Sequence, residues 1–375
     1  MVATSLTASF GDLPDPRSCH GRRYSLNALI TIAICATLCG AEDWVGVAAF
    51  GEAKADWFRT FLDLSEDTPS HDTFDRVFAA INPDAFERCF RVWTGVLATE
   101  LCGTVAIDGK TLRRSFDRAA GKAAIHMVSV WAGEHGLVFG QQATEEKGNE
   151  LTAIPKLIEL LDLRGVTVTI DALGCQKNIA ETLVKKGADY VLAVKDNQPT
   201  LHADVREVFE RTQRAGWGNH THDTHEEVEK NHGRIERRIT TITWDPRLLV
   251  EAAAWPQARC LVRVQRERTV GEKTTTTTHH YITSMDTRRA DRVATAVRSH
   301  WGVENQLHWR LDVVFNEDQC RLRKGNDAEN MSRLRRIALN ALKSDTTKKM
   351  GMKNKRLFAG WDNRYLLSLL KPVSG

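Results

Sequence analysis

Three acidic residues stand in settings that suit metal-dependent phosphodiester chemistry. Asp108 and Asp171 each follow a short run of β-branched residues that predicts a buried strand, and Glu304 lies far downstream in a helical pattern. An acid at the end of an apolar strand is costly to bury as an ion unless a cation or hydrogen-bond donors compensate it. If the three carboxylates converge, we expect them to hold divalent metal.

The two aspartates support each other as candidates. Taken singly, an Asp that ends a strand is more often a turn or cap residue. In the element order predicted below, however, the strands before Asp108 and Asp171 are neighbours in the middle of a sheet, which brings both side chains to one end. Two carboxylates in contact raise each other's pKa unless a cation neutralises them. Mg²⁺ or Mn²⁺ is the natural cation, because both are hard and bind oxygen.

Glu304 belongs to a stripe on one helix face. His300, Glu304, His308 and Asp312 are spaced by four residues, so they form a slowly drifting row. A zinc site of two histidines and one glutamate is an alternative. Zinc ligands on one helix usually pair at one-turn spacing, whereas these histidines are two turns apart, so zinc is the less favoured interpretation. Histidines beside a catalytic acid are better suited to hold phosphate or position the scissile strand.

The expected order of elements predicts an α/β (α+β mixed) fold. After a helical region, the pattern indicates strands at 104–108, 124–132 and 137–143, a helix at 149–162, a strand at 166–171, a helix at 176–186 and a strand at 189–194. Three strands in hairpin succession followed by alternating helix and strand imply a mixed sheet flanked by helices. This is the order of a ribonuclease H-like core.

Composition shifts divide the 375 residues into five segments. We expect an N-terminal helical domain at 1–100, the first part of the catalytic core at 101–201, a β-rich insertion at 202–285, the core continuation with Glu304 and a basic helix at 286–345, and a basic tail at 346–375. Trp301 and Trp309 are expected to pack in the core rather than to stack on bases.

Charge and cysteine content exclude few classes of protein. Lys plus Arg is 52 against 48 for Asp plus Glu, so the net charge of +4 is a weak cue. The eight cysteines are scattered without zinc-type spacing. The apolar run 26–40 faintly resembles a signal peptide, but it begins late and is shorter than the roughly 20 residues of a membrane span. We therefore expect a buried helix, no membrane and a cytoplasmic protein.

Several motifs resemble those of bacterial insertion-sequence transposases with a DDE triad, and the H-repeat-associated proteins are the most similar group. The motifs are Ala106-Ile-Asp108-Gly-Lys-Thr-Leu-Arg-Arg-Ser, Lys147-Gly-Asn-Glu150-Leu-Thr-Ala-Ile-Pro, Ile170-Asp171-Ala-Leu-Gly-Cys-Gln, Tyr190-Val-Leu-Ala-Val-Lys195-Asp-Asn-Gln-Pro, His232-Gly-Arg234-Ile-Glu-Arg-Arg and Arg298-Ser-His-Trp-Gly-Val-Glu304-Asn-Gln-Leu-His-Trp-Arg-Leu-Asp. The resemblance covers nearly the whole chain, including a helical N-terminal domain associated with such transposases.

The resemblance implies that Asp108, Asp171 and Glu304 are the catalytic and metal-binding triad of a ribonuclease H-like transposase. Two Mg²⁺ or Mn²⁺ ions would serve one site, with Asp108 shared and the other two acids completing one ion each. The chain departs from related transposases at one point. Where they place a Tyr and an Arg before the catalytic Glu and a Lys after it, this chain has Val297, His300 and Leu311.

Basic residues near the acids and on later elements are the candidates for binding DNA. On the predicted helix 326–343, Asn and Arg side chains share one stripe, a pattern that suits phosphate and base edges, although a solvated face explains it equally well. The candidate DNA-binding residues are Lys110, Arg113, Arg114, Lys195, Arg234, Arg298, His300, His308, Arg310, Arg333 and Arg336.

The predicted function is that of an insertion-sequence transposase that binds terminal inverted repeats, cuts the element's ends and joins them to target DNA. Its expected partners are double-stranded DNA, at the element ends and the target, and a second protomer in a DNA-dependent homodimer. It would be cytoplasmic and associated with the nucleoid. Two alternatives stay open, namely a catalytically silent DNA-binding derivative of a transposase and a metal-dependent nuclease that does not transpose.

Overall fold

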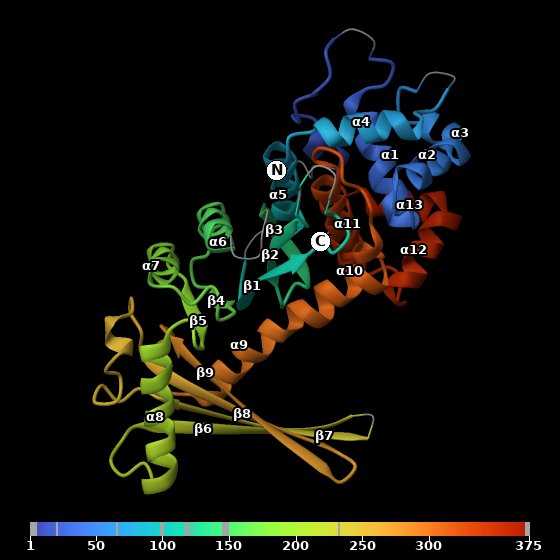
Figure 1. Cartoon of the computed structure of the whole chain (residues 1–375). Helices are drawn as coiled ribbons and strands as arrows, with labels where there is room; N and C mark the ends of the chain where they lie inside the picture. Colours follow the sequence, from blue (N-terminus) through green and yellow to red (C-terminus); the bar gives the residue numbers. More distant parts are fainter. Residues whose placement is uncertain are drawn as a thin grey trace.

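The computed structural model describes residues 6–19, 22–64, 67–97, 101–116, 121, 123–144, 150–231 and 233–371. Among these residues, the central feature is a nine-stranded mixed sheet (Figure 1). Its strand order is β3-β2-β1-β4-β5-β9-β8-β7-β6. Of the motifs above, 147–149 and His232 lie outside the described residues.

The first five strands confirm the predicted core. They are β1 (Thr104–Thr111), β2 (His126–Ala132), β3 (Leu137–Thr144), β4 (Thr167–Ile170) and β5 (Asp189–Val194). The pairs β1–β2 and β2–β3 are antiparallel, whereas β1–β4 and β4–β5 are parallel. Three hairpin-connected strands followed by two parallel strands give the ribonuclease H-like arrangement that the element order predicts.

Helices cover both faces of this core, and strand alternation decides which residues meet them. In β1, Val105 and Ile107 pack in one cluster with side chains of α6 (Glu150–Glu159) and α7 (Lys177–Lys185). Ala106 instead packs in a cluster with side chains of α11 (Asp327–Ser344). Asp108 follows Ala106 by two positions, so it lies on the α11 side of the sheet.

The helical N-terminal region and the C-terminal helices share one hydrophobic core. The first group is η1 (Thr7–Phe10), α1 (Leu26–Cys39), α2 (Trp44–Ala53), α3 (Ala55–Arg59), α4 (His71–Ala80) and α5 (Pro83–Leu97), and the second is α11, α12 (Met352–Trp361) and α13 (Asn363–Leu369). Contrary to the expected basic tail, residues 352–369 are thus mostly helical, and Lys355 and Arg356 are buried. The reason is that Leu366 and Leu369 pack into this core.

The apolar run predicted as a buried helix is α1. Its side chains from Ala28 to Leu38 are almost completely inaccessible to solvent. Among the described residues, no single helix combines the length and apolarity that crossing a membrane requires; only α1 and α2 taken together do, and these two helices meet at a bend of 98°.

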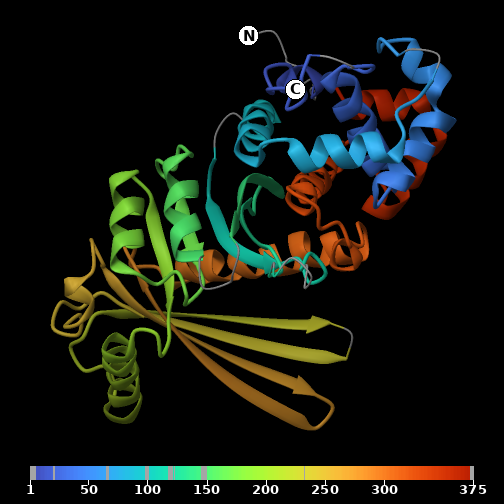
Figure 2. The same ribbon diagram turned by 45° about the horizontal axis from the view of Figure 1, so that its top comes forward.

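The insertion opens with a helix before its strands begin. It contains α8 (Pro199–Ala215), β6 (His222–Asn231), β7 (Arg234–Thr243), η3 (Ala252–Ala254), β8 (Cys260–Val270) and β9 (Lys273–Thr283). The end of β9 pairs antiparallel with β5, from His280 opposite Val194 to Thr283 opposite Val191, so the insertion extends the core sheet. Figure 2 shows its long strands projecting away from the core.

The chain then returns to the core through one long helical stretch. It consists of α9 (Ala290–Gly302), a π-helical segment η4 (Val303–His308) and α10 (Trp309–Val313), followed by a short turn η5 (Glu317–Gln319). Helix α9 contacts β1, β4 and β5, and in Figure 1 it crosses from the insertion toward the N-terminal helices. Single π-helical turns are rare and often occur at functional sites, and this one carries Glu304.

Candidate active site

Asp108 and Asp171 lie at the same level of two neighbouring strands. Ile107 of β1 is opposite Ile170 of β4 in the parallel register. Asp108 is the next residue of β1, and Asp171 is the first residue after β4. The Oδ1 atom of Asp171 accepts hydrogen bonds from the backbone N–H groups of Leu173 at 3.1 Å and Gly174 at 3.4 Å. Asp171 therefore caps the turn after β4, and this turn holds its carboxylate at the C-terminal end of the strand.

The three predicted triad residues line one cavity of about 350 Å³. Asp108 and Asp171 come from the sheet, and Glu304 comes from η4, where its side chain is exposed. Lys195, His300 and His308 line the same cavity. Within the described part of the chain, no three Asp, Glu, His or Cys side chains are already grouped closely enough to hold a metal ion. The acids thus share a cavity without forming a closed ligand shell.

Asp108 has an unusually high affinity for a proton. Burial raises the pKa of its carboxyl to about 7, and the negative charge of Asp171 adds to the effect, followed by those of Glu150 and Glu304. The Nδ1 atom of His308 lies 3.6 Å from Asp108 Oδ2. However, burial, together with the charges of Arg336 and Lys110, lowers the pKa of His308 to about 3. His308 is therefore neutral at pH 7 and does not neutralise Asp108.

This donor set fits a divalent cation. The carboxylates of Asp108 and Asp171 repel each other, and the imidazole beside them is uncharged. A divalent ion would remove the repulsion, and oxygen ligands of this kind are those that Mg²⁺ and Mn²⁺ prefer.

His300 connects α9 to the strand that carries Asp171. Its Nδ1 atom lies 3.1 Å from Thr169 Oγ1, and burial lowers the pKa of the imidazole. Thr169 precedes Asp171 by two positions, so it lies on the same face of β4. This alternation is visible in the sequence, although Thr169 was not among the predicted site residues.

A buried pair beside Asp108 was also missed. His126 Nε2 lies 2.5 Å from Glu150 Oε1, and His126 Nδ1 lies 2.9 Å from Thr111 Oγ1. A Cβ atom on Gly109 would stand only 2.1 Å from His126 Nε2 and 2.6 Å from Glu150 Oε1. The pair therefore packs against the backbone next to Asp108. Glu150 stands in one of the motifs quoted above, which was the available signal, but the motif itself assigned it no role.

The structure corrects the expectation that Lys110 contacts DNA. Its ammonium lies 2.7 Å from Asp312 Oδ1, 2.8 Å from Asp318 Oδ1 and 3.4 Å from Glu317 Oε2, and the side chain is only 9% exposed. A lysine has three donors, and three carboxylates surround this one. Lys110 thus ties β1 to the segment after α10.

Arg333 and Arg336 are corrected in the same way, since both are completely buried. Arg333 Nε donates to Glu87 Oε2 at 3.1 Å, and its Nη1 pairs with Glu329 Oε1 at 2.8 Å. Arg336 Nη1 pairs with Glu317 Oε1 at 2.8 Å. The polar stripe of α11 faces the protein interior and joins the helices to the sheet, so these arginines have no surface to offer DNA in this structure.

The remaining basic candidates lie nearer to solvent. Arg113 is 79% exposed and pairs with Asp318 at 3.1 Å, Lys195 is exposed in the cavity wall, and Arg114 and Arg310 are half-buried. Two others are engaged by acids. Arg234 lies 3.0 Å from Glu236, and Arg298 pairs with Glu229. The insertion therefore presents arginine–glutamate networks rather than bare positive charge.

The two tryptophans expected in the core are on the surface. Trp301 is 45% exposed and Trp309 is 57% exposed. The prediction fails because the apolar residues that anchor this stretch are instead Val303, Leu307 and Leu311, all of which are buried in the core shared with α11.

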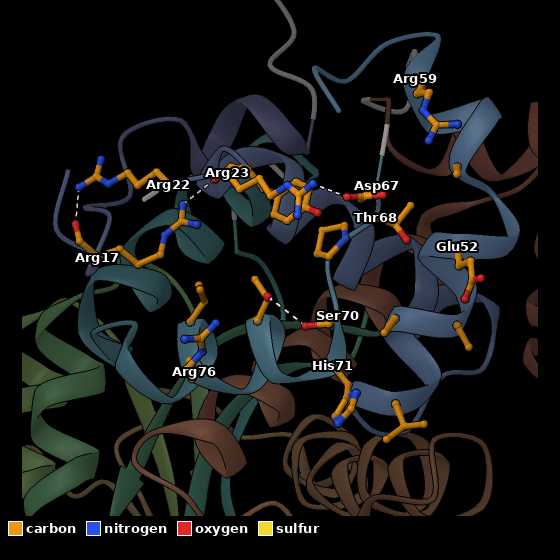
Figure 3. Close-up of a pocket in the computed structure, with 18 residues that line it drawn as sticks. Arg17, Arg22, Arg23, Glu52, Arg59, Asp67, Thr68, Ser70, His71 and Arg76 are labelled. Atoms are coloured by element: carbon orange, nitrogen blue, oxygen red, sulfur yellow. Dashed lines mark hydrogen bonds and ion pairs between the residues drawn. The ribbon is translucent and has the colours of Figure 1, made fainter. Parts of the chain in front are cut away.

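A larger cavity of about 1190 Å³ lies among the N-terminal helices (Figure 3). Its wall includes Arg17, Arg22, Arg23, Arg59 and Arg76. None of the three acids lines it, so this cavity is separate from the candidate active site.

Two family models match most of this chain. A family model described as "Transposase DDE domain" matches residues 103–341, and one described as "DDE_Tnp_1-associated" matches residues 7–94. The chain is 40% identical over 364 residues to the "H repeat-associated putative transposase YhhI" of Escherichia coli (strain K12), covering 96% of this chain and 95% of that protein.

Two further likenesses differ greatly in strength. The "Putative transposase YncI" of Escherichia coli O157:H7 is 36% identical over 378 residues, covering 100% of this chain and 96% of that protein. A solved piggyBac transposase synaptic complex aligns with a TM-score of 0.41 and 11% identity over 100% of this chain and 79% of that chain, a likeness too weak to carry an inference. On the family models and the full-length relatives, the chain belongs to the DDE-domain transposase family and carries that family's associated N-terminal domain.

Proposed function

We propose that this chain is the DNA transposase of an insertion sequence, which binds terminal inverted repeats and then cleaves and joins DNA strands. The observation that carries the proposal is the shared cavity of Asp108, Asp171 and Glu304. Two of these acids come from adjacent strands and the third from a helix more than 130 residues further along the chain. Family membership supports action on nucleic acid in general.

The three carboxylates would together hold two Mg²⁺ or Mn²⁺ ions. Two such ions stabilise the attacking and the leaving oxygen of an in-line phosphoryl displacement. The chain's own residues set the conditions for this. The turn after β4 orients Asp171, the contact between His300 and Thr169 holds α9 against β4, and the neutral imidazole of His308 leaves the negative charge of Asp108 available.

DNA would approach through the exposed basic residues near the cavity. Lys195 lines the cavity and is exposed, and Arg113, two residues beyond β1, is 79% exposed. Both are suited to neutralising backbone phosphates. We further propose that two protomers pair the two element ends on DNA and that the protein acts in the nucleoid. Light scattering that finds one protomer on paired ends would contradict the dimer.

The deciding experiment is cleavage of a labelled duplex that carries the element's own end, in Mg²⁺, Mn²⁺ or EDTA. Wild type is compared with Glu304→Gln, and with Glu181→Gln as a control, because Glu181 is an exposed helix residue paired with Lys185. We expect metal-dependent nicking at the end by wild type and the control, and none by Glu304→Gln. Equal nicking by all three would remove Glu304 from the site.

Two other outcomes would favour different functions. Specific binding to the end without cleavage in any metal would indicate a catalytically silent DNA-binding derivative. One short relative of this chain, 34% identical over 64 residues, is named "Inactive transposase YbfQ" of Escherichia coli (strain K12). Cleavage without strand transfer and without preference for the end would indicate a metal-dependent nuclease.

A further inference from the structure

Lys110 and Asp312 form an ion pair between two elements that carry acids of the site. Lys110 lies on β1, two residues beyond Asp108, and the alternation of side chains along a strand puts both on the same face. Asp312 lies on α10, in the same helical stretch as Glu304. The Nζ atom of Lys110 is 2.7 Å from Oδ1 of Asp312, and the lysine side chain is only 9% exposed. A largely buried ion pair therefore bridges the strand of one acid and the helical stretch of another.

A second contact joins the same two elements one step away. His308 Nδ1 lies 3.6 Å from Asp108 Oδ2. From Asp108 to Lys110 the strand advances by about 6.8 Å, and from His308 to Asp312 the helix advances by about 6 Å. Because these two steps are nearly equal, both contacts form together when the helical stretch lies beside β1 in this register. A slide of the helical stretch by one turn would break both.

The apolar contacts of the helical stretch do not fix this register. Val303, Leu307 and Leu311 are buried in the core shared with α11 and hold the stretch against the rest of the protein. The hydrophobic effect is non-directional and follows the area removed from water, so it tolerates a small slide or rotation of the helix. A close pair of buried charges does not, because separating them leaves each one uncompensated.

Of the three carboxylates around Lys110, only that of Asp312 belongs to the helical stretch. Glu317 and Asp318 lie in η5, beyond its end, and each of them also pairs with an arginine. In the described part of the chain, Lys110 is the only base that pairs with Asp312. The position of Asp312 relative to β1 therefore depends on Lys110.

Contacts of this kind lie on both sides of Glu304 along the helical stretch. Before it, His300 Nδ1 lies 3.1 Å from Thr169 Oγ1 of β4. After it, His308 and Asp312 make the two contacts with β1 described above. Within the described residues, the carboxylate of Glu304 has no ion pair or hydrogen bond of its own. Its neighbours on the stretch thus hold the backbone, and its carboxylate stays available to a ligand.

We propose that Lys110 is a positioning residue for the metal site and that its pair with Asp312 sets the position of Glu304 relative to Asp108. The inference rests on the proposed function, in which these acids hold divalent metal. Lys110 acts through Asp312, since its ammonium is enclosed by carboxylates. Without the pair, the helical stretch can shift on its apolar contacts, and Glu304 and Asp108 are no longer held in place for a common site.

Binding of Mn²⁺ in the absence of DNA tests the positioning role. The electron paramagnetic resonance signal of free Mn²⁺ is titrated with wild type, Asp312→Asn and Asp318→Asn. The last is a matched control, because it removes the same charge at 2.8 Å from Lys110 but lies outside the helical stretch. Loss of a residue that supports a metal ligand weakens metal binding roughly 10- to 100-fold. We expect a loss of this size for Asp312→Asn and the affinity of wild type for Asp318→Asn.

Changes at Lys110 give a second, independent comparison. Lys110→Met keeps the length of the side chain but removes its charge, whereas Lys110→Arg keeps the charge. We expect Lys110→Met to weaken Mn²⁺ binding as Asp312→Asn does, and Lys110→Arg to retain most of the affinity. The double variant of Lys110→Met and Asp312→Asn should lose little more than either single change, because all three break one pair. Thermal melting in EDTA shows whether each variant is folded; if Lys110→Met does not fold, the two aspartate variants decide.

Nicking of the end duplex over a series of Mn²⁺ concentrations separates this inference from the proposed function. We expect Asp312→Asn to need more Mn²⁺ than wild type for half-maximal nicking, while both bind the end equally well in EDTA. A merely structural role would lower the melting temperature without this change in metal requirement.

The outcomes have different meanings. If wild type binds Mn²⁺ but nicks no end, the proposed function fails, and the comparison of Mn²⁺ affinities still decides the positioning role. If wild type binds no Mn²⁺, both fail. Wild-type Mn²⁺ affinity in folded Asp312→Asn would overturn the positioning role alone. Equal losses in Asp312→Asn and Asp318→Asn would also overturn it, because the removal of negative charge near the site would then explain both.

Discussion

Asp108 and Asp171 lie at the same level on neighbouring segments of the chain, because the residues that precede them, Ile107 and Ile170, face each other in the parallel register of β1 and β4. Their mutual repulsion, after burial, keeps the pKa of Asp108 at about 7. The sheet thus holds two negative charges close together, and a shared cation would remove their repulsion.

Removal of one carboxylate should weaken the binding of metal without unfolding the protein. Asp108→Asn relieves repulsion, so its melting temperature in EDTA should equal or exceed that of wild type. Loss of a residue that only orients a metal ligand lowers metal affinity roughly 10- to 100-fold. Asp108 is itself a proposed ligand, so the affinity of Asp108→Asn for Mg²⁺ should fall by at least this factor. Thermal melting and calorimetric titration measure both. Asp56→Asn, at a completely exposed side chain on α3, should behave as wild type, and an unchanged Mg²⁺ affinity of Asp108→Asn would contradict the metal site.

The pH dependence of stability should report the ionisation of Asp108. Its pKa is raised to about 7 in the folded protein, against about 3.9 in an unfolded chain. The folded state therefore binds the proton more tightly, so this contribution to stability is fully present below pH ~3.9 and is lost as pH rises toward 7. In EDTA, the difference in free energy of unfolding between wild type and Asp108→Asn should change over this window. A difference that stays constant from pH 4 to pH 7 would contradict the raised pKa.

Glu317→Gln should be among the most destabilising single changes. Glu317 is buried, and although burial opposes its ionisation, the charges of Arg336 and Lys110 lower its pKa to about 2. The change leaves the buried Arg336 without its carboxylate and removes one of the three carboxylates around Lys110. Breaking a buried ion pair in this way costs about 3–5 kcal/mol. Urea unfolding measures the loss. Glu267→Gln, which removes an exposed pair with Arg237, should cost less than about 1 kcal/mol; equal effects of the two changes would contradict the buried network.

Gly109→Ala should disturb the site through packing alone. The added Cβ would stand 2.1 Å from His126 Nε2, so His126 and Glu150 must move away from the strand of Asp108. Overpacking of this kind costs about 1–3 kcal/mol, and we also expect weaker Mg²⁺ binding. Gly95→Ala on α5 is the control, since nothing lies within 4 Å of its new methyl group and the change removes flexibility from a helix. A fully stable Gly109→Ala protein would show that the pair is free to shift.

The local sequence pattern determined the strands, turns and helices that carry the site, because their formation depends mainly on residues close together in the sequence. The β-branched runs before Asp108 and Asp171 predict strands because such residues suit the pleated backbone, and both strands are present. The hairpin turn before β3, the helices α6 and α7 and the helix that carries Glu304 follow from turn residues and apolar periodicity in the same way. These features together were enough to predict the ribonuclease H-like order.

Only the tertiary structure decided which polar and aromatic side chains are buried. Arg333 resembled a surface residue until the fold placed Glu87, 246 residues away, against it, and Lys110 was enclosed by acids that follow α10. Trp301 resembled a core residue, yet Val303 and Leu307 took the interior positions. Periodicity in the sequence predicts which residues share one face of a helix or strand. The residues that pack against that face come from distant parts of the chain. Those residues determine whether a charge is compensated and whether an indole is buried or exposed to water.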